Sequence, residues 1–348
     1  MGLMSGFGKA KELEKTVKSE ESKGPTTETM LEEHLSNNPP SKRKQKSEPV
    51  DVFSDLREEL KNLHQTRPKT HLFVGIAGHE NTGKSAIVLD AFNRDEEATK
   101  NGDTLDIIDF DGGGSASASA FYPDNERIRC WEPWVMQKND RTAYDYPETH
   151  NRVMKILQFA AQRAREQNEP DYEGPRLWGV HVTGVDLWDS ICINNMRIVD
   201  LNLAKDGIEA ADWNKKVGHQ WDWAIRKTRF HQMTAICRGL VKLGVRVFWE
   251  THLRLTNYTW GKAEDTNPTW RPDWEKASNN YVFQIILCDR EDTYDDESGD
   301  LTKSEYTATF EKCKTNASLQ GQKRTILVTE IGKPPVWIGL PELSDGSL

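Results

Sequence analysis

The segment that most constrains the fold of this chain is an eight-residue glycine loop, GHENTGKS, at Gly78–Ser85. An apolar stretch, Leu72–Ile76, precedes it and is typical of a short buried strand, and apolar residues at helical spacing follow it as far as Phe92. Strand, glycine loop and helix in this order form a phosphate-binding loop, in which backbone N–H groups and the positive end of the helix point at one place. The segment therefore predicts a site for a nucleoside triphosphate.

Individual loop residues have distinct expected roles. Lys84 is expected to reach the β- and γ-phosphates, and the Ser85 hydroxyl is expected to bind Mg²⁺. Gly78 and Gly83 allow turns that a Cβ atom would hinder. The other expected contacts to ATP come from the rest of the loop and the start of the helix, namely His79, Glu80, Asn81, Thr82 and Ala86.

The chain divides by composition into a tail and a domain. Residues 1–68 are rich in Lys, Glu, Ser, Asn and Pro and contain no Trp, so we expect a mostly disordered tail with one short amphipathic helix at residues 52–64. Residues 69–343 are expected to form a single domain. The five cysteines form no C-x-x-C pair and no long apolar run is present, which favours a cytoplasmic protein with no membrane segment. The net charge of −9 argues against a nucleic acid coating the whole surface, but it leaves room for a local basic groove.

The pattern after the loop alternates strands with helices and then becomes a run of strands. This pattern predicts an α/β fold with a mostly parallel central sheet and a C-terminal β-meander. A long stretch without periodicity, residues 253–280, is expected to be a functional loop. The predicted strands are 104–110, 127–131, 177–188, 245–250, 281–288, 306–314 and 325–329, and the long helices are 147–167 and 221–243.

Two further acidic groups are needed beside a triphosphate, one for the Mg²⁺ shell and one for the attacking water. Asp189 follows the strand predicted at 177–188 and is the candidate for the metal, with Asp186 as the alternate. Asp111 is the candidate for water activation, with Asp109 as the alternate. Both choices have simpler alternatives, since Asp189 could cap the next helix and Asp111 could only form a turn before glycines.

The order of these motifs resembles the RecA-type recombinase core over about residues 72–330. It is most similar to the small phage and archaeal-virus RecA-like ATPases, including single-strand-annealing types. The family has a strand ending I-D-x-E-G that supplies the catalytic glutamate, and here Asp111 stands in place of that Glu. The resemblance implies that Asp189-Ser190 matches the family's metal-binding pair and that His252 matches its γ-phosphate sensor.

The resemblance also implies partners. The family's trans-acting basic pair matches Lys312 and Lys314, which would act on a neighbouring subunit in a homo-oligomer or filament. The equal alternative is a pair of solvated lysines on an edge strand, where they block aggregation. The family's two DNA-contacting loops match residues 191–220 and 253–280. Basic residues interleaved with aromatic ones suit single-stranded nucleic acid, although the tryptophans could instead pack the loop down as a lid. The expected contacts in the second loop are Arg254, Trp260, Lys262, Trp270, Arg271 and Trp274.

The sequence thus predicts a Mg²⁺-dependent, DNA-stimulated ATPase that acts on single-stranded DNA in recombination, annealing or replication. We expect a viral or prokaryotic origin, with the host cytoplasm as the location in the viral case, and the tail is a candidate contact for replication or recombination proteins. The alternatives are a packaging or helicase-type motor, a P-loop phosphotransferase, and a nucleotide-gated binding module with little hydrolysis.

Overall fold

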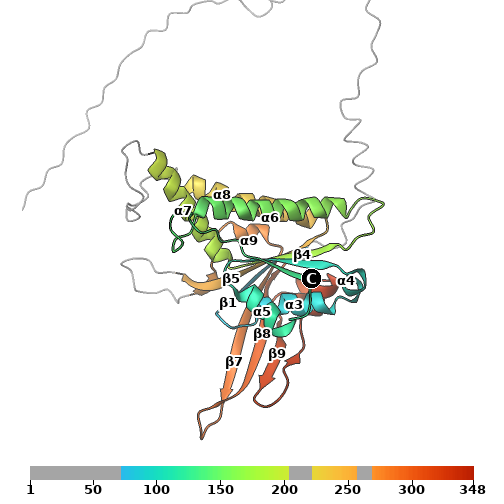
Figure 1. Cartoon of the computed structure of the whole chain (residues 1–348). Helices are drawn as coiled ribbons and strands as arrows, with labels where there is room; N and C mark the ends of the chain where they lie inside the picture. Colours follow the sequence, from blue (N-terminus) through green and yellow to red (C-terminus); the bar gives the residue numbers. More distant parts are fainter. Residues whose placement is uncertain (1–71, 204–221, 257–268) are drawn as a thin grey trace, which may run out of the picture. The chain divides into compact units, whose positions relative to one another are not determined.

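The structure is a computed structural model that describes residues 72–203, 222–256 and 269–348 (Figure 1). These residues belong to one compact unit, Arg67–Leu348. The predicted tail, its helix at residues 52–64, Trp260 and Lys262 lie outside the described residues.

The centre of this unit is a sheet of parallel strands. Neighbouring strands follow the order β7-β1-β5-β4-β2-β3, and every pair in this series is parallel. Every residue of β1, β2 and β4 is buried, as expected where helices cover both faces of a parallel sheet. The bounds are β1 (Phe73–Gly78), β2 (Thr104–Asp109), β3 (Ile128–Trp131), β4 (Leu177–Thr183), β5 (Arg246–Thr256) and β7 (Gln284–Tyr294).

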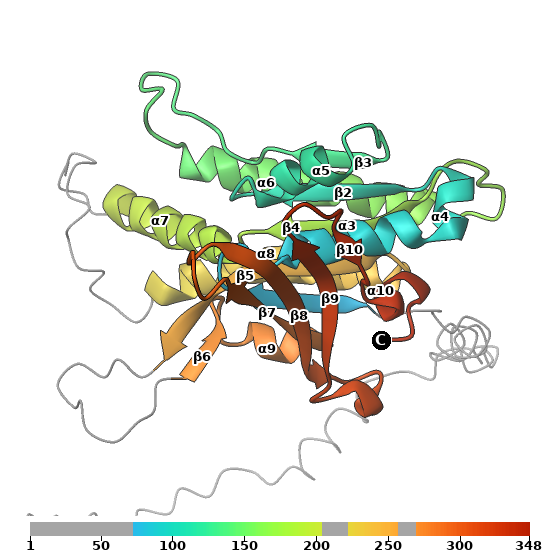
Figure 2. The same cartoon turned by 90° about the horizontal axis from the view of Figure 1, so that it is seen from below.

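Two layers of helices cover the two faces (Figures 1 and 2). One face carries α3 (Lys84–Arg94), α4 (Glu96–Asn101) and α5 (Gly113–Phe121), whose apolar side chains form one hydrophobic core with the sheet. The other face carries α6 (Tyr146–Glu166), α7 (Val185–Leu203) and α8 (Asp222–Lys242), which form a second core. The sheet therefore separates two hydrophobic cores. The carboxyl ends of its parallel strands lie together along one edge, between the two layers of helices.

The C-terminal part extends the sheet with antiparallel strands. β8 (Leu301–Cys313), β9 (Lys323–Glu330) and β10 (Val336–Trp337) follow β7 in that order, and β7 and β8 form a long ribbon (Figure 1). The remaining elements of the described residues are β6 (Thr269–Pro272), α9 (Ser278–Tyr281), a 3₁₀ turn at Ala317–Leu319, and α10 (Pro341–Asp345). The predicted α/β class, with a mostly parallel central sheet and a C-terminal meander, is confirmed.

Three predicted segments differ from the structure. The strand predicted at 177–188 ends at Thr183, because Gly184 adopts φ +64° and α7 begins at the next residue. The run of small residues Ser115–Ala120, whose composition predicts a flexible connection, lies within α5. The Asp109 carboxylate explains this helix, since it accepts the N–H groups of Gly114 and Ser115 in its first turn. The predicted loop at 253–280 is structured in its described parts, where the end of β5 pairs with β6.

The close packing of β1 against the second core gives a test of the fold. A Cβ atom on Gly75 would lie 2.3 Å from the Trp274 ring, so we expect Gly75→Ala to lower the free energy of unfolding by about 1–3 kcal/mol. A Cβ atom on Gly239, inside α8, would meet no atom within 4 Å, and Gly239→Ala should stabilise by about 0.5–1 kcal/mol. Urea unfolding followed by circular dichroism measures both, and equal stability of the two variants would contradict this packing.

Candidate nucleotide site

The glycine loop joins the end of β1 to the start of α3 and is closed by its own hydrogen bonds. The Thr82 hydroxyl donates to the His79 carbonyl at 2.9 Å, and Gly83 has φ +79° at the helix N-cap. A Cβ atom on Gly78 would lie 2.5 Å from the Thr82 hydroxyl oxygen and 2.6 Å from the Cys288 carbonyl oxygen. Only glycine fits at Gly78, because β7 and the loop approach its backbone from two sides.

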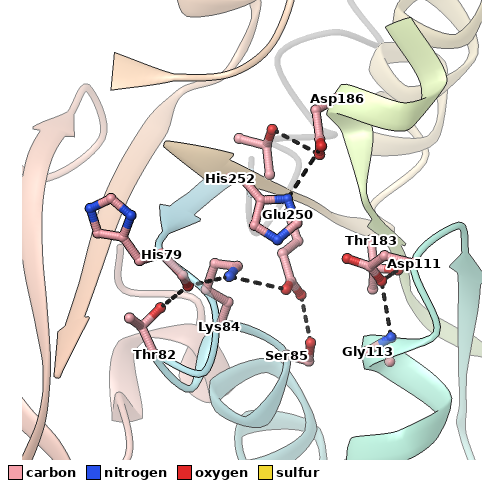
Figure 3. A network of polar contacts seen from close by, with 12 residues as sticks. His79, Thr82, Lys84, Ser85, Asp111, Gly113, Thr183, Asp186, Glu250 and His252 are labelled. Atoms are coloured by element: carbon pink, nitrogen blue, oxygen red, sulfur yellow. Dashed lines mark hydrogen bonds and ion pairs between the residues drawn. The ribbon is translucent and has the colours of Figure 1, made fainter. Parts of the chain in front are cut away.

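Lys84 and Ser85 are buried in the first turn of α3, and both reach one carboxylate (Figure 3). The Lys84 ammonium donates to the His79 carbonyl at 2.7 Å and lies 3.9 Å from Glu250 Oε1. The Ser85 hydroxyl donates to Glu250 Oε2 at 2.7 Å. The two side chains predicted to bind phosphate and Mg²⁺ are therefore held side by side at the end of β1.

Glu250 is the site residue that the sequence analysis missed. It lies on β5, opposite Ile76 of β1, and is only 4% exposed. Its other neighbour is the fully buried His181 of β4, with Nε2 at 3.2 Å from Glu250 Oε2. The sequence does contain a signal for Glu250, because this residue ends an otherwise apolar run, VRVFWE. A carboxylate buried with such a strand requires polar partners.

The expectation that Asp189 follows a strand and meets the metal is wrong. Asp189 lies on α7, where its carboxylate forms an ion pair with Arg226 of α8, including a hydrogen bond of 2.8 Å from Arg226 Nε. Asp189 therefore ties two helices together and does not line the cavity at the loop. The alternate, Asp186, accepts a hydrogen bond from His252 Nδ1 at 3.2 Å and one from the Thr251 hydroxyl at 3.4 Å.

Asp109 and Asp111 differ in their surroundings. Burial would raise the pKa of Asp109, but hydrogen bonds from Ser115, Thr183 and Gly114 outweigh it and hold the pKa below its ordinary value. Asp111 accepts the Gly113 N–H at 3.0 Å, so it also forms the predicted turn before the glycines. Partial desolvation, followed by the charge of Glu250, raises the pKa of Asp111.

A cavity of about 470 Å³ lies above the loop, a size common for small-molecule sites. All the loop residues from Glu80 to Ala86 line it, together with the polar side chains of Asp111, Glu250 and His252. Apolar and aromatic side chains complete the wall, namely Phe121, Tyr306 and Leu327. The cavity thus combines the Lys84 ammonium and the backbone of the glycine loop, which suit phosphates, with apolar surface suited to a nucleoside.

Lys312 and Lys314 lie away from this cavity. Lys312 pairs with Ile285 at the beginning of β7, whereas the glycine loop follows the opposite ends of the parallel strands. The Lys312 ammonium donates to the backbone carbonyls of Asn279 and Val282, and the hydrogen bond to Val282 is 2.7 Å long. Burial, and then the neighbouring Lys314 ammonium, lower the pKa of Lys312. Their action on a neighbouring subunit stays a prediction.

The residues predicted to contact nucleic acid separate into three groups. Trp270 is 53% exposed and packs edge-on against the His79 ring, with centroids 4.5 Å apart. Arg271 pairs in register with Arg254, which forms a 3.0 Å ion pair with Asp273. Trp274 is only 2% exposed, because it packs on Gly75 and Trp249 in the core, so its assignment as a nucleic-acid contact is wrong.

Comparison with known proteins gives a structural likeness alone. No protein-family model and no curated protein matches the chain. Among 254 matching chains of solved structures is a KaiC-like protein from the hyperthermophilic archaeon Pyrococcus horikoshii OT3. It is 10% identical, with a TM-score of 0.37, and the match covers 74% of this chain and 85% of that chain. A likeness at this level establishes neither a family nor an activity for the chain.

Within the described residues, none of the helices has the length and apolar character needed to cross a membrane.

The His252–Asp186 pair gives a pH-dependent prediction. The hydrogen bond to Asp186 raises the pKa of His252, so this imidazole keeps its positive charge beside the cavity to a higher pH than an ordinary histidine. Asp186→Asn should lower the pKa of His252, because burial and the Lys84 charge then act against the imidazolium. A proton NMR titration of the His252 ring measures this shift.

Asp189→Asn is the matched control, since Asp189 lies on the same helix but pairs with Arg226. This change should leave the His252 titration unchanged. Equal His252 pKa values in wild type and Asp186→Asn would contradict the pairing.

Proposed function

We propose that this chain is a RecA-like, Mg²⁺-dependent ATPase. The observation that carries the proposal is the convergence of Lys84, Ser85 and Glu250 at the mouth of a glycine loop, beneath a cavity that Asp111 and His252 also line. The parallel order β7-β1-β5-β4-β2, with the loop following a central strand, supports a RecA-like arrangement. A nucleoside triphosphate is the ligand whose charge and size suit this combination.

The residues present fit a magnesium ion. Mg²⁺ prefers oxygen ligands and keeps several waters, so it needs only one or two protein groups beside the phosphates. Ser85 and Glu250 offer a hydroxyl and a carboxylate that already lie 2.7 Å apart. Glu250 thus takes the role that was predicted for Asp189. When bound, the ion would neutralise charge on the phosphate oxygens.

The side chains of the site have separate roles in the proposed hydrolysis. Lys84 supplies a fixed positive charge for the β- and γ-phosphates, and His252, whose pKa is raised by Asp186, adds a second cation at the cavity wall when it is protonated. Asp111 accepts a proton from the attacking water. The water oxygen bonds to the γ-phosphorus as the bond to the β–γ bridging oxygen breaks, and that oxygen leaves with the electron pair on ADP.

Substitutions at Lys84 and Glu250 test this function. Lys84→Ala should abolish hydrolysis and weaken ATP binding, because it removes the fixed charge at the phosphates. Glu250→Gln should keep most of the nucleotide affinity, lower the turnover number by about 10-fold or more, and raise the Mg²⁺ concentration needed for half-maximal activity. Phosphate release measures turnover, and a fluorescent ATP analogue measures binding.

Glu166→Gln, an exposed change near the end of α6, is the control and should behave as wild type. Hydrolysis at the wild-type rate by Lys84→Ala would show that this cavity is not the nucleotide site.

We further propose that the ATPase acts on single-stranded DNA, in recombination, annealing or replication. Trp270 supports this proposal, because its exposed ring can stack on a base while its contact with His79 connects it to the glycine loop. Arg271 follows it directly and can meet a phosphate. The pair lies on β6, next to the strand that carries Glu250 and His252.

Trp270→Ala should weaken the binding of a single-stranded oligonucleotide by about 1–3 kcal/mol, since one stacking surface is lost. Trp274→Ala is the contrasting variant. It should reduce the free energy of unfolding, because Trp274 is a core residue, without a specific loss of DNA affinity in the folded fraction. Fluorescence anisotropy measures the affinity, and turnover with single-stranded DNA, duplex DNA and RNA identifies the preferred polymer. Unchanged affinity in folded Trp270→Ala would contradict this contact.

A further inference from the structure

The end of β4 places one hydroxyl between two carboxylates. Thr183 is fully buried, and its Oγ1 lies 2.7 Å from Asp109 Oδ1 and 2.8 Å from Asp111 Oδ1 (Figure 3 shows Thr183 and Asp111). Both carboxylates come from the end of β2 and the turn after it, and β2 is the strand next to β4. No role for Thr183 follows from the sequence pattern.

Gly184 leaves the space that allows the end of β4 to lie close to the turn after β2. Its φ of +64° turns the chain out of β4, and a Cβ atom there would lie 3.1 Å from Phe110 Cβ and 3.3 Å from Asp111 Cβ. A larger residue would both strain the backbone and push the Asp111 turn away from β4. The contact between Thr183 and Asp111 is therefore built into the turn.

Counting hydrogens distinguishes the two carboxylates. A threonine hydroxyl has one hydrogen, so Thr183 can donate to only one of two oxygens at hydrogen-bond distance. Asp109 also accepts the N–H groups of Gly114 and Ser115 and the Ser115 hydroxyl, a set of donors that favours its ionised form. Among the described residues, Asp111 has one further donor besides Thr183, the Gly113 N–H. Asp109 is therefore held ionised by its other donors, and the single Thr183 hydrogen can go to an ionised Asp111, which has fewer donors.

We propose that Thr183 is a positioning residue, which bridges an ionised Asp109 to Asp111 and leaves Asp111 as the carboxyl that gains and loses the proton of hydrolysis. The kinetic consequence of this inference rests on the proposed ATPase function. The arrangement of the three side chains is independent of that function. The proposed bridge also resolves the choice between Asp109 and Asp111 in favour of Asp111 as the group facing the water.

The electrostatic surroundings agree with this division of roles. The pKa of Asp109 lies below its ordinary value and that of Asp111 above it. The charged groups described around Asp111 are Asp109 at the end of β2, Glu250 and His252 on β5, and Lys84 on α3. The Thr183 hydrogen bond lowers the pKa of Asp111, so its loss would raise that pKa further.

Thr183→Val and Thr183→Ser test the proposal in the full-length protein. Valine keeps the shape of threonine without the hydroxyl, and serine keeps the hydroxyl without the methyl group. We expect Thr183→Val to lower kcat by about 10-fold or more, within the range of general acid–base effects, with KM for ATP changed less than about twofold. The acidic limb of its kcat/KM pH profile should move to higher pH. Thr183→Ser should restore most of kcat and the wild-type position of that limb.

A second measurement does not depend on hydrolysis. In protein labelled with ¹³C at the aspartate carboxyl carbons, signals assigned with Asp109→Asn and Asp111→Asn should show Asp111 titrating at higher pH than Asp109. Thr183→Val should move the Asp111 titration further upward. Titration of Asp109 above Asp111 would overturn the inference, whatever the enzyme's activity.

The kinetic outcomes are equally distinct. Wild-type kcat and pH profile in Thr183→Val would overturn the inference, as would a Thr183→Ser protein as impaired as Thr183→Val, because the methyl group would then carry the effect. A wild-type protein that binds no ATP would instead refute the proposed function, and the carboxyl titration would still decide the role of Thr183.

Discussion

The buried carboxylate of Glu250 is the constraint around which the site is organised. A negative charge that is 4% exposed is costly unless polar partners surround it, and here the partners come from two other elements of the fold. Ser85 and Lys84 reach it from the first turn of α3, and His181 reaches it from β4. These contacts fix the start of α3 against the adjacent strand β5 and hold the glycine loop in shape. Removal of the carboxylate would leave Ser85 without its hydrogen-bond acceptor and would remove the group that lies beside Lys84 and His181.

The fold brings these groups together because the parallel strands end at one edge of the sheet. Gly78, Asp109, Thr183 and Glu250 come from four strands that are neighbours in the order β1-β5-β4-β2. The N-terminal turns of α3 and α5 begin at the same edge, so their N–H groups favour negative charge there. In the proposed function, phosphate binding, metal binding and water activation thus fall to residues on separate strands of one sheet, at the usual location of ligands in open α/β folds.

Local sequence was sufficient to predict the glycine loop and the turn at Asp111, since each depends on residues close together in the chain, while the roles of these residues stay predictions. It was insufficient for Glu250, because Ser85 and Glu250 lie 165 positions apart and meet only through the pairing of β1 with β5. Asp189 was misplaced because the apolar run Leu177–Trp188 does not show that Gly184 ends the strand and that a helix follows. Trp274 was misplaced because an aromatic residue in a polar segment has the same pattern whether it faces solvent or fills the space above Gly75.

The most direct test of the account is a crystal structure of the protein with Mg²⁺ and a non-hydrolysable ATP analogue. We expect the phosphates to lie on the loop with Lys84 at the β- and γ-phosphates, and the metal beside Ser85 with Glu250 contacting it or its waters. Asp111 should lie within hydrogen-bond reach of a water facing the γ-phosphate. A nucleotide bound elsewhere, or a metal at Asp189 with Glu250 unengaged, would contradict the account.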